Sequence, residues 1–142
     1  MAKKTVQKKA RKHQQQGPMV ALYNLDAGTS RGDAVRAALA ELGIRTRAIT
    51  AAHLNDSVGS IAGMVGMHPS PKPFEGEAPR DEFMLVCNMP GKQLDGMLAA
   101  LRQANASIAH KAQVTAHNRL WPMHVLMAEI AKEHAAMTKP NE

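Results

Sequence analysis

Apolar residues along the chain occur either in short runs typical of strands or at the spacing of a helix. The order of these patterns predicts a strand–helix–strand unit near the start. Residues 20–25 form a short apolar run that is typical of a buried strand. Apolar residues at helical spacing then predict a helix that opens at Thr29–Ser30 and stops at Gly43. Residues 44–50 predict a second strand, and its arginines on one face favour an edge position.

The same order returns later in the chain. Residues 82–88 form the most hydrophobic predicted strand, which favours a central place in a sheet. An amphipathic helix that ends near Asn105 follows it, and residues 108–114 predict another strand. The last helix is predicted over 117–137. Because Pro122 fits only the first helical turn, we expect that helix to begin before it, between Thr115 and Trp121.

The connection between the two units is long. Asn55 or Asp56 can cap a third helix, whose apolar stripe runs from Leu54 to Val65. Residues 67–81 carry four prolines and are expected to be irregular. A loop of this length inside a compact domain is often functional.

These elements predict the fold class and the domain boundaries. Two strand–helix–strand units suggest an internal duplication. Their order also matches an α/β (α+β) fold, a ferredoxin-like βαββαβ sandwich with an inserted helix and a C-terminal helix. That arrangement places strands 20–25 and 82–88 in the centre of the sheet. A purely parallel doubly wound sheet is the alternative. We expect one domain over 19–137, with a frayed C-terminus at 138–142.

Composition narrows the class of protein. A chain of 142 residues with 44% hydrophobic residues suits one globular domain. A single cysteine excludes a disulfide framework and any zinc or iron–sulfur site built on several cysteines. No apolar run is long enough to span a membrane, and no apolar stretch follows the basic N-terminus as in a secretory signal. We therefore expect a soluble, cytoplasmic protein without membrane partners.

The formal net charge of +6 belongs to one segment of the chain. In the rest of the chain acidic and basic residues balance, so we expect a disordered basic tail over 1–18. The tail is a candidate arm for RNA, DNA or another polyanion, with Arg45 and Arg47 as possible additions, or else a solubilising tail without a specific partner. Its candidate contacts are Lys3, Lys4, Lys8, Lys9, Arg11 and Lys12.

The stretch 111–121 is the richest in candidate binding residues. It is predicted to run from the end of a strand into the start of a helix, where hydrogen-bonding side chains and the only tryptophan gather. One interpretation is a polar pocket roofed by an aromatic ring. The other is a helix cap beside a tryptophan that packs on the sheet. The candidate ligand-binding residues are Lys111, Thr115, His117, Asn118 and Trp121.

Other candidate chemistry receives little support. The seven histidines lack the spacings of a metal site, and Cys87 lies within an apolar strand, where a thiol is inert. The turn from Asp26 to Asp33 could hold an anion at a helix N-terminus, but its carboxylates favour ordinary capping. We predict no catalytic residues, no metal and no cofactor.

The pattern Lys111-Ala-x-x-Thr115-x-x-Asn118-x-x-Trp121 resembles a small bacterial family that is known only as a domain of unknown function. The helix that follows and the predicted strands 22–25 and 82–86 are also similar to it. The resemblance covers about residues 19–135. It implies a recurring domain, but no activity, cofactor or catalytic residue.

The leading hypothesis is a non-enzymatic binding or regulatory domain with a basic arm. The second hypothesis is a nucleic-acid-associated protein that binds through the tail. A third is a small-ligand sensor whose 67–81 loop folds over a site.

Overall fold

The computed structural model describes residues 17–138, in which the two predicted units build one four-stranded sheet. Residues 1–16 and 139–142 lie outside the described part, and most of the predicted basic tail and frayed C-terminus falls on them. The elements are β1 (Met19–Tyr23), α2 (Ser30–Glu41), β2 (Arg45–Ile49), the short 3₁₀ helix η1 (Ala51–His53), α3 (Val58–Ile61), β3 (Phe83–Cys87), α4 (Gly91–Gln103), β4 (Lys111–Gln113) and α5 (Met123–Thr138).

The strand order is β2-β1-β3-β4. β1 pairs with β2 and β3 pairs with β4 in parallel, whereas β1 and β3 are antiparallel. The mixed α/β class and the central position of the two apolar strands are therefore confirmed. The ferredoxin-like order is not found, because that fold splits each βαβ unit with a further strand, and here each unit keeps its strands side by side. The antiparallel central pair also excludes a purely parallel sheet.

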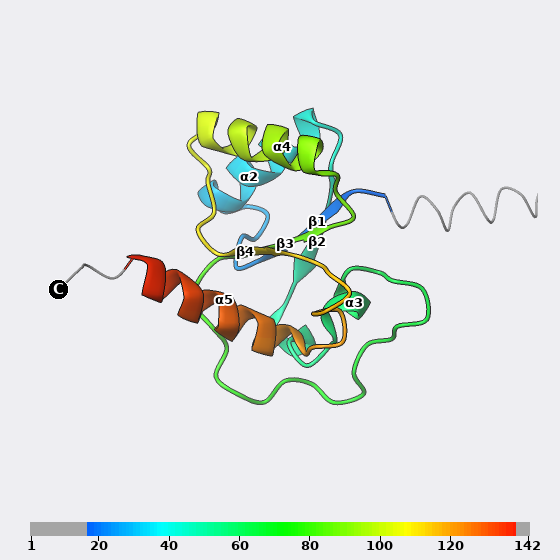
Figure 1. The fold of residues 1–142 in the computed structure, drawn as a ribbon. Coiled ribbons are helices and arrows are strands. Elements are labelled where there is room, and N and C mark those ends of the chain that lie inside the picture. Colours follow the sequence, from blue (N-terminus) through cyan, green and yellow to red (C-terminus); the bar gives the residue numbers. More distant parts are fainter. Residues whose placement is uncertain (1–16, 139–142) are drawn as a thin grey trace, which may run out of the picture.

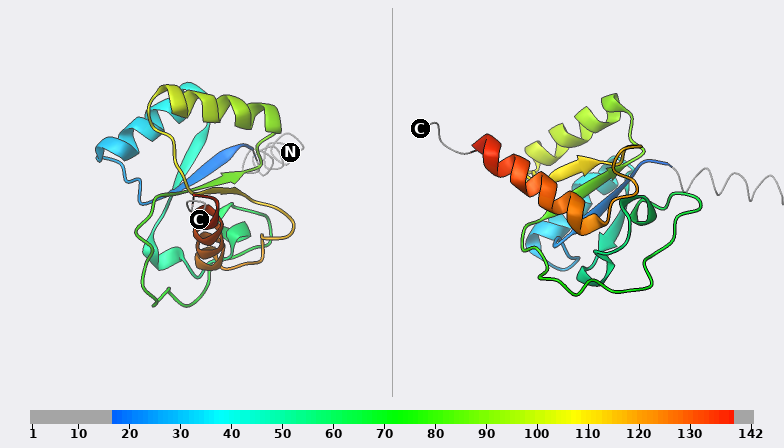
Figure 2. Two further views of the ribbon diagram at one scale, coloured as in Figure 1. Left: turned by 60° about the vertical axis from the view of Figure 1, so that its left-hand side comes forward. Right: turned by 60° about the horizontal axis from the view of Figure 1, so that its bottom comes forward.

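Helices cover both faces of the sheet. Figures 1 and 2 show α2 and α4 on one face and α3 and α5 on the other. The alternation of side chains along β1 supplies both layers, since Val20 and Leu22 pack under α2 and α4 while Ala21 and Tyr23 belong to the opposite core. Every residue of β1 and β3 is buried, which explains their unbroken apolar sequences.

The two halves of the molecule repeat one order of elements and meet through reciprocal contacts. In the sheet, Met19 lies opposite Cys87, and Tyr23 lies opposite Phe83. The first residue of each central strand therefore pairs with the last residue of the other strand. This symmetric register agrees with the internal duplication that the order of elements suggests.

The segments around α3 and α5 also contact each other in a reciprocal way. The backbone N–H of Val58 donates to the carbonyl of Trp121 at 2.8 Å, and the N–H of Met123 donates to the carbonyl of Asp56 at 2.8 Å. Each bond joins the first residue of one helix to the segment before the other helix. An approximate twofold axis therefore relates β1-α2-β2-α3 to β3-α4-β4-α5.

The third helix is shorter than predicted and has a different cap. The hydroxyl of Ser57, rather than Asn55 or Asp56, accepts the capping bond from the N–H of Ser60 at 3.1 Å. Glycines with positive φ follow the single turn and end it, which leaves Val65 64% exposed.

The last helix begins later than predicted, at Met123 directly after Pro122. The predicted start before Pro122 is wrong, because residues 116–120 form turns instead of helix and Leu120 is 65% exposed. Residues 67–81 contain no helix or strand, as predicted, and β2 is an edge strand, as predicted.

Candidate functional site

The predicted polar stretch after β4 is built around one turn. The side-chain carbonyl of Asn118 accepts from the N–H of Thr115 at 2.9 Å, and the hydroxyl of Thr115 accepts from the N–H of Asn118 at 3.0 Å. The Asn118 amide also donates to the carbonyl of Gln113 at 2.9 Å, and Asn118 is only 8% exposed. These side chains hold the chain in its path from β4 towards α5.

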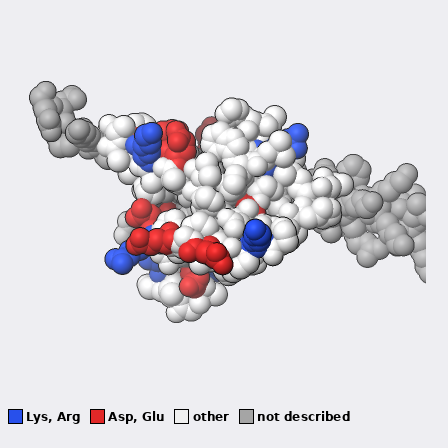
Figure 3. All heavy atoms as spheres, turned by 90° about the horizontal axis from the view of Figure 1, so that it is seen from below, with Lys and Arg blue, Asp and Glu red and all other residues white. Residues whose placement is uncertain are grey.

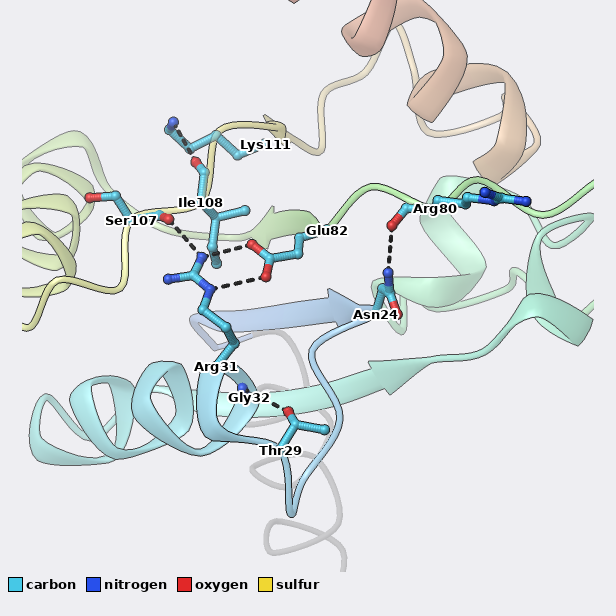
Figure 4. Close-up of polar contacts among 9 residues, drawn as sticks. All are labelled: Asn24, Thr29, Arg31, Gly32, Arg80, Glu82, Ser107, Ile108 and Lys111. Carbon is cyan, nitrogen blue, oxygen red and sulfur yellow. Dashed lines mark hydrogen bonds and ion pairs between the residues drawn. The ribbon is translucent and has the colours of Figure 1, made fainter.

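The other three candidates of this stretch also have local partners. The Lys111 ammonium donates to the carbonyl of Ile108 at 2.9 Å, and Figure 4 shows it there. The rings of His117 and Trp121 meet edge to face at 5.1 Å, and Trp121 packs against the core between the sheet and α5. The five predicted ligand-binding residues therefore do not converge on one pocket.

A cleft of about 460 Å³ opens at the end of β3, between α3 and the turn after β4. Apolar side chains form most of its wall, with an amide, a hydroxyl and a guanidinium among them. Of the five predicted residues, only Thr115 reaches it. The lining residues are Gly17, Ala62, Gly63, Met64, Val65, Cys87, Asn88, Val114, Thr115, Ala116 and Arg119.

A second hollow of about 340 Å³ shares Ala62 and Gly63 with this cleft. It follows β2 and is also lined by Arg45 and Arg47. Together with Arg119, three guanidinium groups line the two hollows, and no Asp or Glu of the described residues is among the linings. We call the two hollows together the arginine cleft. Within it, the guanidinium of Arg47 donates to the carbonyl of Ile61 at 2.9 Å.

Cys87 lies at the base of the arginine cleft and is 3% exposed. Burial raises the pKa of its thiol to about 12, although Arg47 and Arg45 act in the opposite direction. At neutral pH the thiol is therefore protonated and a poor nucleophile. The expectation from sequence that this cysteine is buried is confirmed.

The loop before α2 uses its polar groups for capping. The hydroxyl of Thr29 accepts from the N–H of Gly32 at 3.0 Å, and the carboxylate of Asp33 accepts from the N–H of Gly28 at 2.8 Å. The N–H groups of Gly28 and Gly32 are thus bonded within the loop. This agrees with the capping interpretation of the segment from Asp26 to Asp33.

No group of three or more His, Cys, Asp or Glu side chains within residues 17–138 is arranged to hold a metal ion. His134 is half-buried, and its ring packs edge to face on that of His110 at 4.7 Å. In the same region of the chain, no helix is both long and apolar enough to cross a membrane.

The arginine cleft was missed by sequence reasoning because its walls come from several distant segments. One signal was present, however. Asn24 follows β1 and Asn88 follows β3, and both have the unusual φ of 59°. The repeated asparagine marks corresponding positions in the two halves, and Asn88 lines the cleft.

Residues 82–137 match the family model described as Domain of unknown function (DUF3783). This match confirms the resemblance to a domain of unknown function for the segment from β3 to α5. The first half of the chain, for which the resemblance was also expected, lies outside the matched range. Comparisons with curated proteins and with solved structures gave no match.

Proposed function

We propose that this protein is a non-enzymatic binding domain that holds an anionic ligand in the arginine cleft. The observation that carries the proposal is the sign of the charge around the two neighbouring hollows, whose described lining includes Arg45, Arg47 and Arg119 and no Asp or Glu. Guanidinium groups bind carboxylates and phosphates with two parallel hydrogen bonds, and apolar walls strengthen such contacts by excluding water. The mixture of apolar wall and cationic rim is typical of a ligand site.

The protonation of Cys87 supports binding rather than catalysis. Its thiol is the strongest potential nucleophile among the residues that line the cleft, and its pKa of about 12 keeps it neutral. The remaining polar groups in the wall are suited to hydrogen bonding, and Thr115 is already bonded within its own turn.

The second candidate function is binding of RNA or DNA through residues 1–16. One observation favours a joint role with the cleft: Gly17, the first described residue, lines it. The six basic residues of the tail are therefore joined to the chain beside the arginine cleft. On this alternative the tail supplies most of the affinity, which falls steeply as salt is added.

Titration followed by amide NMR spectra tests the proposed function on the full chain. The probes are poly-L-glutamate, inorganic triphosphate and a single-stranded RNA. We expect shifts at amides around the cleft, such as those of Ala62 to Val65 and Asn88. A variant with Arg45→Gln, Arg47→Gln and Arg119→Gln is expected to lose them.

A matched variant removes the same number of charges elsewhere. Lys92→Gln, Arg102→Gln and Lys132→Gln lie on α4 and α5, are exposed and do not line the cleft. This control is expected to bind like the unaltered protein. If both variants lose binding to the same extent, net charge alone explains the binding, and a defined site is contradicted. RNA binding that disappears when residues 1–16 are deleted, but survives the arginine variant, would favour the second candidate.

A further inference from the structure

The C-terminal ends of β1 and β3 are equivalent positions in the two halves, but the chain covers only the first of them. β1 ends in Tyr23-Asn24 and β3 ends in Cys87-Asn88, and each asparagine adopts φ 59° directly after its strand. Because the approximate twofold axis exchanges these ends, what binds at one of them indicates what the architecture accommodates at the other.

The end of β1 is occupied by the chain's own connection to β3. The Asn24 amide donates to the carbonyl of Arg80 at 2.6 Å, and the Tyr23 hydroxyl donates to the carbonyl of Pro79 at 2.7 Å. Figure 4 shows the first of these bonds. Both acceptors are backbone carbonyls of a segment without helix or strand. The site therefore recognises two successive backbone carbonyls of an irregular peptide segment.

This connection is anchored on either side of those bonds. Arg31 of α2 makes two hydrogen bonds to the carboxylate of Glu82, at 2.7 and 3.0 Å, and a third to the carbonyl of Ser107 at 2.9 Å (Figure 4). Upstream, the ring of Phe74 packs on His124 at 4.9 Å. The segment from 74 to 82 thus covers the end of the first half as a bound peptide would.

The end of β3 has the same asparagine but an open cleft. Cys87 stands where the first half has Tyr23, and the smaller side chain leaves space at the base. Asn88 is exposed, and no hydrogen bond of its side chain to another described residue is found. Its amide is therefore available to a backbone carbonyl, as the Asn24 amide is to Arg80.

Charge specifies the peptide further. The segment that occupies the first site is acidic, with four acidic residues and one basic residue over 75–82. Figure 3 shows acidic side chains gathered in a band on the face that carries α5 and this connection. The open cleft has the opposite sign, with Arg45, Arg47 and Arg119 around it.

We propose that the arginine cleft binds an extended, acidic peptide segment of a partner protein. The Asn88 amide donates to one of its backbone carbonyls, and the arginines pair with its carboxylates. This inference rests on the proposed function, since it names the class of anion that the cleft holds. The apolar wall accommodates small side chains between the charged ones.

Fluorescence anisotropy with a labelled synthetic peptide tests the inference on the full chain. The probe is the sequence of residues 75–82, because the structure already shows this sequence in the equivalent site. We expect saturable binding that is at least tenfold weaker when the acidic residues of the peptide are replaced by Gln and Asn. Asn88→Gly, which retains the freedom for positive φ, is expected to weaken binding about tenfold through the loss of one hydrogen bond.

Asn105→Gly is the matched control. Asn105 is also exposed and has φ 56°, but it lies after α4 and does not line the cleft. Its variant is expected to bind the peptide as the unaltered protein does. Cys87→Tyr, which copies the first half, is expected to block the cleft. Because a larger side chain at this buried position also disturbs packing, the decisive comparison is Asn88→Gly against Asn105→Gly.

The outcomes separate this inference from the proposed function. Peptide binding that is lost in the arginine variant but unchanged in Asn88→Gly would overturn backbone recognition and leave an anion-binding cleft. Absence of binding by the peptide and by all three anions would overturn both proposals. Tighter binding of a single-stranded RNA that displaces the peptide would assign the cleft to nucleic acid and overturn the peptide inference.

Discussion

Gly32→Ala is the sharpest test of how α2 is seated on the sheet. Gly32 is buried in the first turn of α2, where the chain passes close to the loop after β1. A Cβ atom at this position would overlap the backbone carbonyl oxygen of Asp26 and lie 2.7 Å from that of Leu25. Both obstacles are backbone atoms, so no side-chain rotation can relieve them. Either α2 or the loop must shift.

The magnitude follows from two opposing terms. In an unobstructed helix, replacing Gly by Ala stabilises by about 1 kcal/mol. Overpacking a buried site costs about 1–3 kcal/mol, and a backbone collision belongs at the upper end. We therefore expect Gly32→Ala to lower the free energy of unfolding by about 2 kcal/mol. Gly96 of α4 is the matched control, since nothing lies within 4 Å of its added Cβ, and Gly96→Ala is expected to stabilise by about 0.5–1 kcal/mol.

Urea denaturation followed by circular dichroism measures both variants. The slope of the free energy against urea concentration should stay constant, so that the shift in midpoint reports stability alone. The decisive quantity is the sign of the difference between the two alanine variants. If Gly32→Ala proves as stable as Gly96→Ala, then α2 does not approach the loop as closely as described, and the reasoning is refuted.

Three further predictions concern single side chains. Tyr23→Phe removes the bond to Pro79, so we expect about 1 kcal/mol lower stability and faster tryptic cleavage after Arg80; unchanged cleavage would argue against this anchor. Asn118→Ala leaves the Thr115 N–H and the Gln113 carbonyl without partners, and is expected to cost about 2 kcal/mol in urea denaturation. The raised pKa of Cys87 means that the folded protein holds the thiol proton more tightly than the unfolded chain does. Its contribution is therefore present below pH 9.0 and lost as the pH rises towards 12, and Cys87→Ala should flatten the decline of stability in that range.

The sequence predicted the elements that carry long apolar patterns. β1 and β3 were recognised as buried central strands because all their residues are apolar enough for burial on both faces. α4 was recognised from its stripe, of which Met97 and Leu101 are buried. Such patterns depend only on local spacing, which a sequence shows directly.

The neighbours of each strand could not be predicted in the same way. The apolar pattern of β2 shows that it is half exposed, but not whether it lies beside β1 or beyond β3, since both outer positions offer the same environment. The start of α5 failed for a related reason. Thr115 and Asn118 have the side chains of helix caps, yet they bond to each other and close a turn ahead of the helix.

Only one of the predicted ligand-binding residues belongs to the candidate site. Thr115 was among the predicted residues and lines the cleft, while Arg45 and Arg47 entered the predictions only as possible helpers of the basic tail. The floor of the cleft depends on small residues such as Ala62 and Gly63, which carry no chemical signal of their own. Only folding brings them beside Cys87.

The match of the family model to residues 82–137 has a structural meaning once the halves are compared. That range holds β3, α4, β4 and α5, which form one of the two repeated units. Such a unit alone would leave one edge of β3 open, with its buried apolar residues exposed and the N–H of Met123 unpaired. In this chain the first half closes that edge through β1 and through the reciprocal bonds around α3. Residues of both halves form this shared interface, whereas the C-terminal ends of β1 and β3 do not meet across the axis. Tyr23 and Cys87 differ at these strand ends, where the connection before β3 covers the first end and the cleft lies at the second.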